Sequence, residues 1–233
     1  ELRTPLNAIL GFGQLLESDT QEPLTISQLE NVEQITKAGW HLLELVNEVL
    51  DLARIEAGKM QVQMTDLLLA EVVRECIGLI TPLAAERRIL INDEISPCMT
   101  HHVRANHTRL KQVLLNYLSN AVKYNRQGGE ISLKCEQIPG GLLRVSVSDT
   151  GPGIPDSMLD ELFLPFNRLD ADDTDVQGTG VGLAIVKRMM ELMGGSVGVS
   201  SVVGRGSTFW VDMHEVFPGV EEATPEREHL EAI

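Results

Sequence analysis

Aromatic side chains, basic side chains and cysteines are all scarce in this chain of 233 residues. Aromatic residues make up only 4% of the sequence, so aliphatic side chains must build the hydrophobic core. Lysine and arginine together number 19 against 34 acidic residues, which gives a formal net charge of −15. A surface of that sign repels phosphate groups and argues against a protein that binds nucleic acid or an anionic membrane. We therefore expect no nucleic-acid partner.

The three cysteines, Cys76, Cys98 and Cys135, are scattered along the chain. Their spacing matches neither a metal site nor a disulfide framework, and such sparse usage is typical of a reducing compartment. The sequence therefore predicts no disulfide and a cytoplasmic location. No apolar run approaches the roughly 20 residues of a membrane span, and no signal peptide is visible.

The acidic residues gather in two segments. Residues 154–175 and residues 212–233 each contain seven acids and one basic residue, so these two segments carry most of the excess charge. Acidic runs of this kind are usually solvent-exposed. We interpret the first as a polar loop, and residues 217–233, which also contain two prolines, as an acidic tail or linker.

Residues 1–60 are predicted to form a helical hairpin. The second helix has a coiled-coil seam with spacings of three and four residues, made of Val32, Ile35, Gly39, Leu42, Val46, Val49 and Ala53. Ser27 is a plausible cap for this helix. Two helices with such broad apolar stripes cannot bury them alone, so we expect a dimer that forms a four-helix bundle. The alternative is a hairpin packed on the rest of the chain.

Residues 64–216 are predicted to form an α/β sandwich. Segments with alternating polarity indicate strands at 60–67, 89–95, 130–138 and 142–150, with two more between 196 and 213. Helices are predicted at 69–87, 110–124 and 181–193. The expected fold class is therefore α+β: a helical hairpin followed by a sandwich in which helices cover one face of a sheet and the other face is open.

Three segments of the predicted sandwich carry polar residues in patterns suited to a ligand. On helix 110–124, Gln112, Asn116, Asn120 and Lys123 form one polar stripe, which either faces solvent or holds a metal ion and a phosphate. The sequence DTGPGI, from Asp149, is either an ordinary turn or a rigid turn that a flat ligand can approach closely. The sequence GTGVGLAIVKRM, from Gly178, places glycines before an amphipathic helix, an arrangement that binds phosphates. A dinucleotide fingerprint is excluded because these glycines follow a polar loop rather than a strand.

Taken in order, these motifs resemble the sensor histidine kinases of two-component systems, over residues 1 to about 215. ELRTPLNAI is similar to the H-box, LLNYLSNAVKY to the N-box and DTGPGI to the G1 box. LFLPFNRL is similar to the F-box, GTGVGLAIVKRM to the G2 box, and GRGSTFWV to the closing glycine and Ser/Thr segment. The resemblance implies that the cofactors are ATP and Mg²⁺, in the fold that gyrase-like and Hsp90-like ATPases share.

The resemblance also implies a role for particular residues. Asp149 would accept a hydrogen bond from the adenine amino group, Asn120 would coordinate Mg²⁺, and Arg168 would stabilise the γ-phosphate during transfer. Phe163 and Phe166 would brace a lid over the nucleotide. The remaining residues implied at the nucleotide site are Asn116, Lys123, Tyr124, Gly151, Gly153, Ile154, Gly178, Thr179, Gly180, Val181, Gly182, Leu183 and Thr208.

Asn116 favours a kinase over an ATPase. The hydrolytic relatives of this fold resemble one another in having a glutamate one turn before the asparagine that binds the metal, whereas this chain has Asn116 there. Without a carboxylate at that place no general base activates water. A non-catalytic dimeric scaffold that senses ATP, an ATPase, and a phosphatase acting through Glu1 and Thr4 are the alternatives.

In the family, the phosphoacceptor is a histidine immediately before the glutamate of the H-box. Glu1 is the first residue here, so we expect that histidine just before it in the parent protein, and no histidine of this chain lies in the motif. The carboxylate of Glu1 would orient the imidazole, and Thr4 would position water for dephosphorylation of a response regulator. The expected partners are a response-regulator receiver domain, a second copy of the chain, and an upstream sensor domain that can anchor the parent protein in a membrane.

Overall fold

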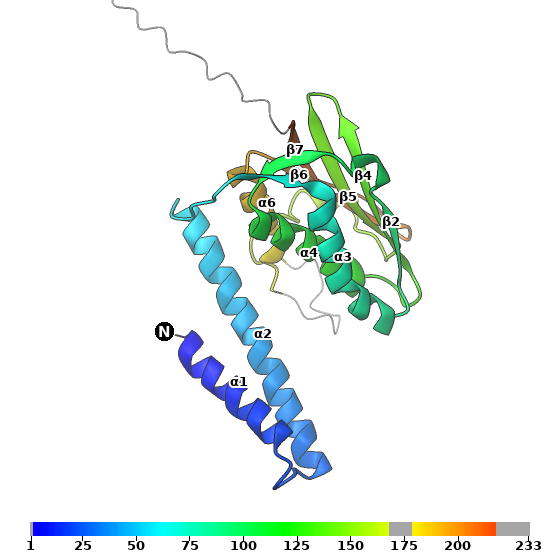
Figure 1. The fold of residues 1–233 in the computed structure, drawn as a ribbon. Helices are drawn as coiled ribbons and strands as arrows, with labels where there is room; N and C mark the ends of the chain where they lie inside the picture. Colours follow the sequence, from blue (N-terminus) through cyan, green and yellow to red (C-terminus); the bar gives the residue numbers. More distant parts are fainter. Residues whose placement is uncertain (1, 168–178, 218–233) are drawn as a thin grey trace, which may run out of the picture.

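The computed structural model describes residues 2–167 and 179–217. Figure 1 shows a long helical hairpin, α1 (Arg3–Ser18) and α2 (Ile26–Glu56), that projects from an α/β sandwich. The predicted fold class is therefore confirmed for a single chain. None of the helices within the described residues is both long and apolar enough to cross a membrane.

The two helices of the hairpin pack closely because small residues lie where they cross. A Cβ atom on Gly13 would lie 2.7 Å from Thr36 Oγ1, and one on Gly39 would lie 2.8 Å from Leu10 Cδ2. α2 begins with a capping box at Thr25, whose hydroxyl accepts from the Gln28 N–H while the Gln28 side chain accepts from the Thr25 N–H. The predicted cap at Ser27 is therefore wrong, because Ser27 already lies inside the helix.

Much of the predicted seam of α2 stays exposed in one chain. Ile35 is 54% exposed and Leu42 is 50% exposed, although Gly39 between them is buried against α1. The C-terminal part of α2 behaves differently, since Leu52 and Ile55 are buried and belong to the core cluster of the sandwich. The hairpin thus packs on the rest of the chain at one end only, and its other end keeps a large apolar surface.

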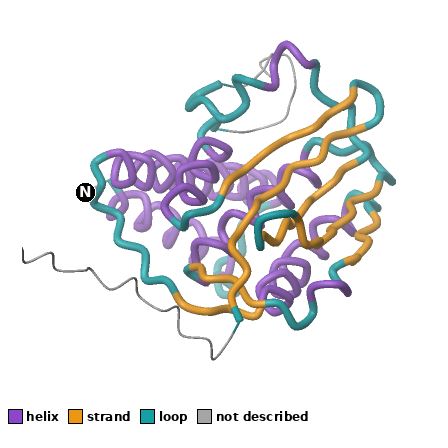
Figure 2. The backbone as a smooth tube through the Cα atoms, turned by 90° about the horizontal axis from the view of Figure 1, so that it is seen from above, coloured by secondary structure: helices purple, strands orange, loops and turns teal. Residues whose placement is uncertain are grey.

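The sandwich is built on a seven-stranded sheet with the order β1-β3-β7-β5-β4-β2, in which β6 pairs with β7 beside this path. Its strands are β1 (Thr65–Leu68), β2 (Leu90–Glu94), β3 (His102–Ala105), β4 (Glu130–Ile138), β5 (Leu142–Asp149), β6 (Ser196–Val202) and β7 (Gly206–Val216). All pairings are antiparallel except that of β2 with β4. Figure 2 shows the strands side by side, with helices lying against the sheet.

The helices of the sandwich are α3 (Leu69–Glu86), α4 (His107–Lys123), α5 (Asp156–Leu159) and α6 (Gly182–Leu192), with a 3₁₀ turn η1 (Ser96–Cys98). Leu143, Val145 and Val147 of β5 point into a core that α3, α4 and α6 cover. The alternate residues face the open side, where Arg144 forms a bidentate ion pair with Asp212 at 2.7 and 2.9 Å. One covered face and one open face were predicted from the alternation, and the structure agrees.

Strands β1 and β3 differ from the sequence prediction. β1 covers only Thr65–Leu68 rather than 60–67, and β3 was not predicted at all. β3 has four residues, and it exists because Val103 pairs with Leu67 on one side and Glu215 on the other. A strand this short is specified by its neighbours more than by its own pattern.

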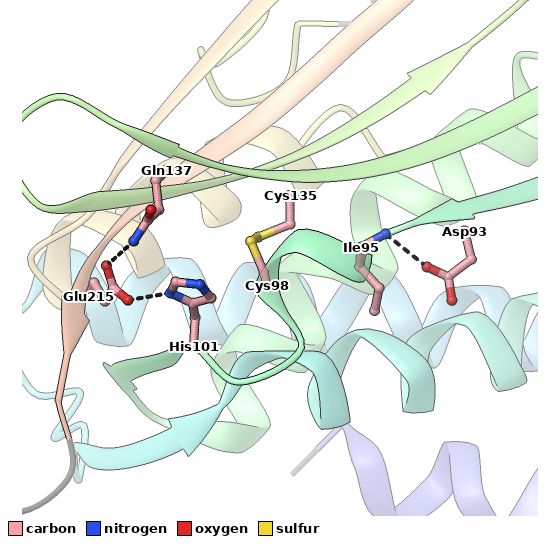
Figure 3. Close-up of a disulfide and its surroundings, with 7 residues drawn as sticks. All are labelled: Asp93, Ile95, Cys98, His101, Cys135, Gln137 and Glu215. Atoms are coloured by element: carbon pink, nitrogen blue, oxygen red, sulfur yellow. Dashed lines mark hydrogen bonds and ion pairs between the residues drawn. A yellow bond between two sulfur atoms is a disulfide. The ribbon is translucent and has the colours of Figure 1, made fainter.

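Cys98 and Cys135 form a disulfide, which corrects the prediction that the chain has none. The parallel register of β2 and β4 places Glu94 opposite Lys134, so the 3₁₀ turn that follows β2 reaches Cys135. Figure 3 shows the bond between that turn and β4, near the pair formed by His101 and Glu215. Sequence spacing gave no sign of the pair, because the two cysteines are 37 positions apart and β3, α4 and the first part of β4 lie between them. Cys76 is a free, buried thiol.

Candidate functional site

The polar stripe of α4 lies under another helix rather than in open solvent. α4 begins at the Asn106 cap, whose side chain accepts from the Arg109 N–H at 3.1 Å, and it buries Leu110, Leu114 and Leu118 in the core. On the polar side, Arg109 Nη1 lies 3.3 Å from Asp51 Oδ2 of α2. Gln112 donates to the same oxygen at 3.5 Å. The solvent-facing interpretation of this stripe is therefore wrong for its first turn.

The middle of the stripe meets the start of α6. The Asn120 side-chain amide donates to Asn116 Oδ1 at 3.2 Å, which leaves the Asn120 carbonyl oxygen for another partner. A Cβ atom on Gly182 would lie only 2.4 Å from Asn116 Nδ2, so a glycine is required for this contact. The N-box and G2-box predictions thus converge at one place, with Val181 buried directly before α6.

The C-terminal end of α4 carries Lys123 and Tyr124. The Lys123 ammonium lies 5.2 Å from the centre of the Tyr124 ring, and Tyr124 is 42% exposed. Arg87, which sequence reasoning missed, supports this end. The Arg87 guanidinium donates to the carbonyls of Val122 and Lys123, which have no helical donors, and to that of Asn125. An arginine after a helix is too common a signal to be noticed in sequence.

The buried side chain of Asn125 connects this helix end to the DTGPGI turn. Its carbonyl oxygen accepts from the Thr150 hydroxyl at 3.2 Å, and its amide donates to the Glu130 carbonyl at 2.9 Å. The Thr150 hydroxyl in turn accepts from the Glu130 N–H. Asn125 immediately follows the predicted motif, but its role depends on a strand pairing that the local sequence does not show.

Asp149 lies at the end of β5, where the sheet meets α4. Its Oδ1 atom accepts from the N–H groups of Gly151 at 2.8 Å and Ser207 at 3.4 Å. Among the described residues Oδ2 has no such donor, so it can accept from a ligand. Burial raises the pKa of the Asp149 carboxyl above its ordinary value, and the two backbone hydrogen bonds act in the opposite direction.

The turn after Asp149 lies directly against the β6–β7 hairpin. Gly153 has a φ of 73°, and a Cβ atom there would lie 2.2 Å from the Val202 carbonyl oxygen. The Ile154 N–H donates to the Ser201 hydroxyl at 2.7 Å, and Ser201 lies 2.9 Å from the Ser207 hydroxyl. A Cβ atom on Gly151 would likewise lie 2.6 Å from the Tyr124 carbonyl oxygen. The two serines are further supporting residues that the sequence prediction lacked.

Thr208 lies in the sheet behind Asp149. Its hydroxyl is 2.8 Å from that of Ser148, its partner in the register of β5 and β7. Gly206, two residues earlier, has a φ of 117°, and a Cβ atom there would lie 1.9 Å from the Asp149 carbonyl oxygen. The closing segment predicted from GRGSTFWV therefore packs against the aspartate predicted from DTGPGI.

The F-box and G2-box segments are joined by one backbone hydrogen bond. The Phe166 N–H donates to the Gly180 carbonyl at 2.9 Å, and Phe166 has a φ of 63°, unusual for a bulky residue. Phe166 is 66% exposed while Phe163 is partly buried. The Val181 N–H donates to the Thr179 hydroxyl, and Leu183 packs against the core.

Three predicted site residues lie outside the described residues: Glu1, Arg168 and Gly178. The same holds for residues 168–178 of the expected lid. Thr4 lies within the described residues. It is the second residue of α1, and its side chain is exposed. It is far along the chain from the other site residues and lies on the projecting hairpin, not beside them (Figure 1).

One acidic side chain at the site comes from an unexpected element. Glu48 of α2 lines a cavity together with Gln112 and Asn116 of α4 and Gly182 of α6. Burial raises the pKa of the Glu48 carboxyl, and a hydrogen bond with Thr179 and the charge of Lys123 act against that rise. Its Oε2 atom is buried and has no hydrogen-bond partner within residues 2–167 and 179–217. Nothing in the motifs indicated this residue.

The residues present fit a nucleotide with a magnesium ion. Gly151, Gly153 and Gly182 let the Asp149 turn and the start of α6 pack closely against Tyr124, Val202 and Asn116, and Asp149 offers an acceptor oxygen beside the turn. The described residues contain no cluster of three or more His, Cys, Asp or Glu side chains suited to a metal. Mg²⁺ commonly binds through one or two protein oxygens together with phosphate oxygens, so a single carbonyl such as that of Asn120 suffices.

Two protein-family models match the chain. Residues 1–58 match "His Kinase A (phospho-acceptor) domain", and residues 105–216 match "Histidine kinase-, DNA gyrase B-, and HSP90-like ATPase". The first covers the hairpin, and the second covers most of the sandwich, including α4, the Asp149 turn, α6 and the β6–β7 hairpin. The models thus agree with the division that the fold displays.

Curated relatives align over nearly all of the chain. The circadian input-output histidine kinase CikA of Synechococcus elongatus is 37% identical over 226 residues, 95% of this chain and 30% of the relative. The sensor histidine kinase GacS of Pseudomonas protegens is 35% identical, over 92% of this chain and 23% of the relative. The autoinducer 2 sensor kinase/phosphatase LuxQ of Vibrio vulnificus is 35% identical, over 91% of this chain and 25% of the relative. The chain therefore spans less than a third of these relatives.

Solved structures share the same fold. Full-length ShkA in complex with AMPPNP is 38% identical with a TM-score of 0.78, over 92% of this chain and 44% of that one. The catalytic domain of the histidine kinase ThkA is 30% identical with a TM-score of 0.58, over 65% of this chain and 95% of that one. ThkA in complex with the response regulator protein TrrA is 24% identical with a TM-score of 0.64, over 91% of this chain and 57% of that one. At this identity the comparison shows a shared fold only.

Proposed function

Because the chain belongs to the sensor histidine kinases, we propose that it is the kinase core of a longer signalling protein. In this proposal it binds Mg-ATP, transfers the γ-phosphoryl group to a histidine that precedes Glu1, and passes it on to an aspartate of a response regulator. The observation that carries the proposal is the convergence of Asn116 and Asn120 of α4 with Gly182 of α6, on the same helix α4 whose end packs against the Asp149 turn. The ShkA complex with AMPPNP, an ATP analogue, supports the choice of nucleotide.

We assign the functions to three segments of the chain. Residues 1–60 would carry the phosphoacceptor and the dimer interface, residues 64–216 would bind ATP, and residues 217–233 would be an acidic tail or linker. The exposed apolar residues of α1 and α2 support a four-helix bundle formed with a second copy, since few single domains leave so large an apolar surface uncovered. The sensor domain would lie upstream in the parent protein.

Asp149 would select the adenine base. Its Oδ1 is held by two backbone N–H groups, so the carboxylate has a fixed direction, and Oδ2 is left to accept from an amino group. Gly151, Gly153 and Ile154 would let the base and ribose approach the backbone, with Thr208 behind them. Lys123, Tyr124, and the backbone N–H groups of Thr179 to Leu183 would hold the phosphates, together with Gly178. Phe166 would close over them.

The Asn120 carbonyl would hold Mg²⁺, which when bound neutralises charge on the phosphate oxygens. Asn116 fixes the Asn120 amide by accepting its N–H, so the carbonyl oxygen is directed away from Asn116. Neither asparagine can act as a general base, because an amide does not take up a proton near neutral pH. The site would therefore retain the γ-phosphoryl group for the histidine, with Arg168 stabilising its charge during transfer.

Glu1 would orient the phosphoacceptor imidazole and accept its proton. Thr4, one helical turn away and exposed on α1, would position water to dephosphorylate the response regulator. Phosphatase activity is a second candidate function, which the name sensor kinase/phosphatase of the relative LuxQ favours. Transfer to a response regulator is favoured by the ThkA–TrrA complex, in which a kinase of this fold was crystallised with such a protein.

The proposed location is the cytoplasm, where ATP and receiver domains are found. The disulfide between Cys98 and Cys135 is unusual for that compartment. The two cysteines lie in η1 and β4, which contribute no residue to the proposed nucleotide site, although the loop that the bond closes contains α4.

Phosphoryl transfer can be tested by adding the missing residue. We expect a chain extended by a histidine before Glu1 to acquire acid-labile label from ATP labelled at the γ-phosphate. The matched control carries alanine in the added position and should remain unlabelled. A chain that binds ATP but takes no label would favour the scaffold, and rapid release of labelled phosphate without labelled protein would favour the ATPase.

A further inference from the structure

The C-terminal half of α2 covers the place where the nucleotide phosphates are proposed to bind. Asp51 contacts Arg109 and Gln112 on the first turns of α4. One helical turn before it, Glu48 reaches the cavity bounded by Asn116 and Gly182. Leu52 and Ile55 of the same helix are buried in the core of the sandwich. This part of α2 therefore packs firmly against the sandwich.

Glu48 places a negative group among the residues that would bind phosphate. The Thr179 side chain and the charge of Lys123 both act to lower the pKa of the Glu48 carboxyl, so Glu48 lies near both groups. Both belong to the proposed phosphate site. A carboxylate accepts from the same donors as a phosphate and carries the same sign of charge, so the two groups compete for this place and repel each other.

The space between the helices is too small for both groups. The cavity that Glu48 lines has a volume of about 30 Å³, room for one or two water molecules and not for a phosphate. The Oε2 atom of Glu48 is buried there without a hydrogen-bond partner among the described residues, which costs free energy. The docked position of Glu48 is therefore held by the packing and ion pair of α2, and not by an ideal site of its own.

We propose that α2 is an inhibitory contact, in which the Glu48 carboxylate occupies the phosphate site and must leave before the phosphates of ATP can bind. This inference rests on the proposed nucleotide site. Because the coupling is reciprocal, Mg-ATP weakens the contact of α2 with α4 by the same factor that this contact weakens Mg-ATP binding. Movement of α2, to which an upstream sensor would connect through the hairpin, thereby sets the affinity for ATP.

The test compares the dissociation constants of Mg-ATP and of adenosine in the whole chain. We expect Glu48→Gln to tighten Mg-ATP binding roughly three- to tenfold, because the fraction of chains with an open site rises. Adenosine has no phosphates, so its affinity should not change. Glu33→Gln, the same chemical change at an exposed position of α2, is the matched control and should leave both constants unchanged.

Asp51→Asn is the second variant, and it keeps the test decisive if Glu48→Gln folds poorly by circular dichroism. It removes the ion pair with Arg109 but touches no proposed phosphate ligand, and it should also tighten Mg-ATP binding, by a smaller factor. Unchanged or weaker Mg-ATP binding in both variants would overturn the inference, as would equal gains for adenosine. Absence of binding of either ligand to any form of the chain would instead refute the proposed function on which the inference rests.

Discussion

The hairpin and the sandwich differ in how completely they bury the apolar residues of their helices. Leu110, Leu114 and Leu118 of α4 are completely buried, whereas Ile35 and Leu42 of α2 remain about half exposed. Both helices have similar apolar stripes in sequence. The sandwich encloses its stripe within one chain, whereas the hairpin leaves its stripe exposed, and we propose that a second copy covers it. The stability of the sandwich should therefore be independent of protein concentration, and that of the hairpin should depend on it.

The largest effect expected from this comparison is at Leu114. Leu114→Ala should lower the free energy of unfolding of the sandwich by about 2–5 kcal/mol, because it leaves a cavity in a fully packed core. Leu42→Ala makes the same change on a residue that is 50% exposed. In a dilute, monomeric sample it should cost no more than about 0.5 kcal/mol.

Urea titrations at low and high protein concentration distinguish the effects of the two substitutions. The cost of Leu114→Ala should be the same at both concentrations, and the cost of Leu42→Ala should grow with concentration as a dimer forms. A concentration-independent cost at Leu42 would contradict the view that the seam serves a second copy.

The second effect concerns the disulfide of the sandwich. Its loop of 37 residues should contribute about 3–4 kcal/mol by restricting the unfolded chain. Reduction of the bond, or the double change Cys98→Ala and Cys135→Ala, should lower the unfolding transition of the sandwich and leave the hairpin unchanged. The Cys76→Ala variant controls for loss of a thiol. Mass spectrometry of the unreduced protein that finds three free thiols would refute the bond itself.

The smallest effect lies at the start of α2. Thr25→Ala removes the side-chain half of the capping box and should destabilise the hairpin by about 1 kcal/mol. Ser27→Ala, two residues later within the helix, should have almost no effect. Far-ultraviolet circular dichroism melts of both variants measure the difference, and equal melts would mean that the helix begins elsewhere.

The sequence predicted the elements whose signals are local. The hairpin, the long helices and the glycine turns were foreseen because periodicity, caps and motifs lie within a few residues. β3, the Cys98–Cys135 bond and the Asn125 network were missed, because each depends on which strands become neighbours in space. Thr25 with Gln28 and Ser27 with Glu30 both match the capping-box pattern, so the sequence alone does not distinguish the two caps.

The candidate site likewise contains residues that the sequence predicted and one that it did not. Asp149, Asn116, Asn120 and Gly182 were named from motifs, and the structure brings them to one edge of the sandwich. Glu48 was not foreseen, because it belongs to a different part of the chain and reaches the site only through the packing of α2 on α4 and α6. A motif describes the residues of one domain and carries no information on what another domain places over it.

The central claim is that the sandwich binds ATP through Asp149, and calorimetric titration of Mg-ATP into the wild-type chain and Asp149→Asn tests it most directly. An asparagine can accept from the Gly151 and Ser207 N–H groups, and burial raises the pKa of the Asp149 carboxyl, so the variant should be as stable as the wild type or slightly more so. Its affinity for Mg-ATP should fall at least about 100-fold, because an acceptor matched to the adenine amino group is lost. Unchanged affinity in a folded Asp149→Asn protein would contradict the account.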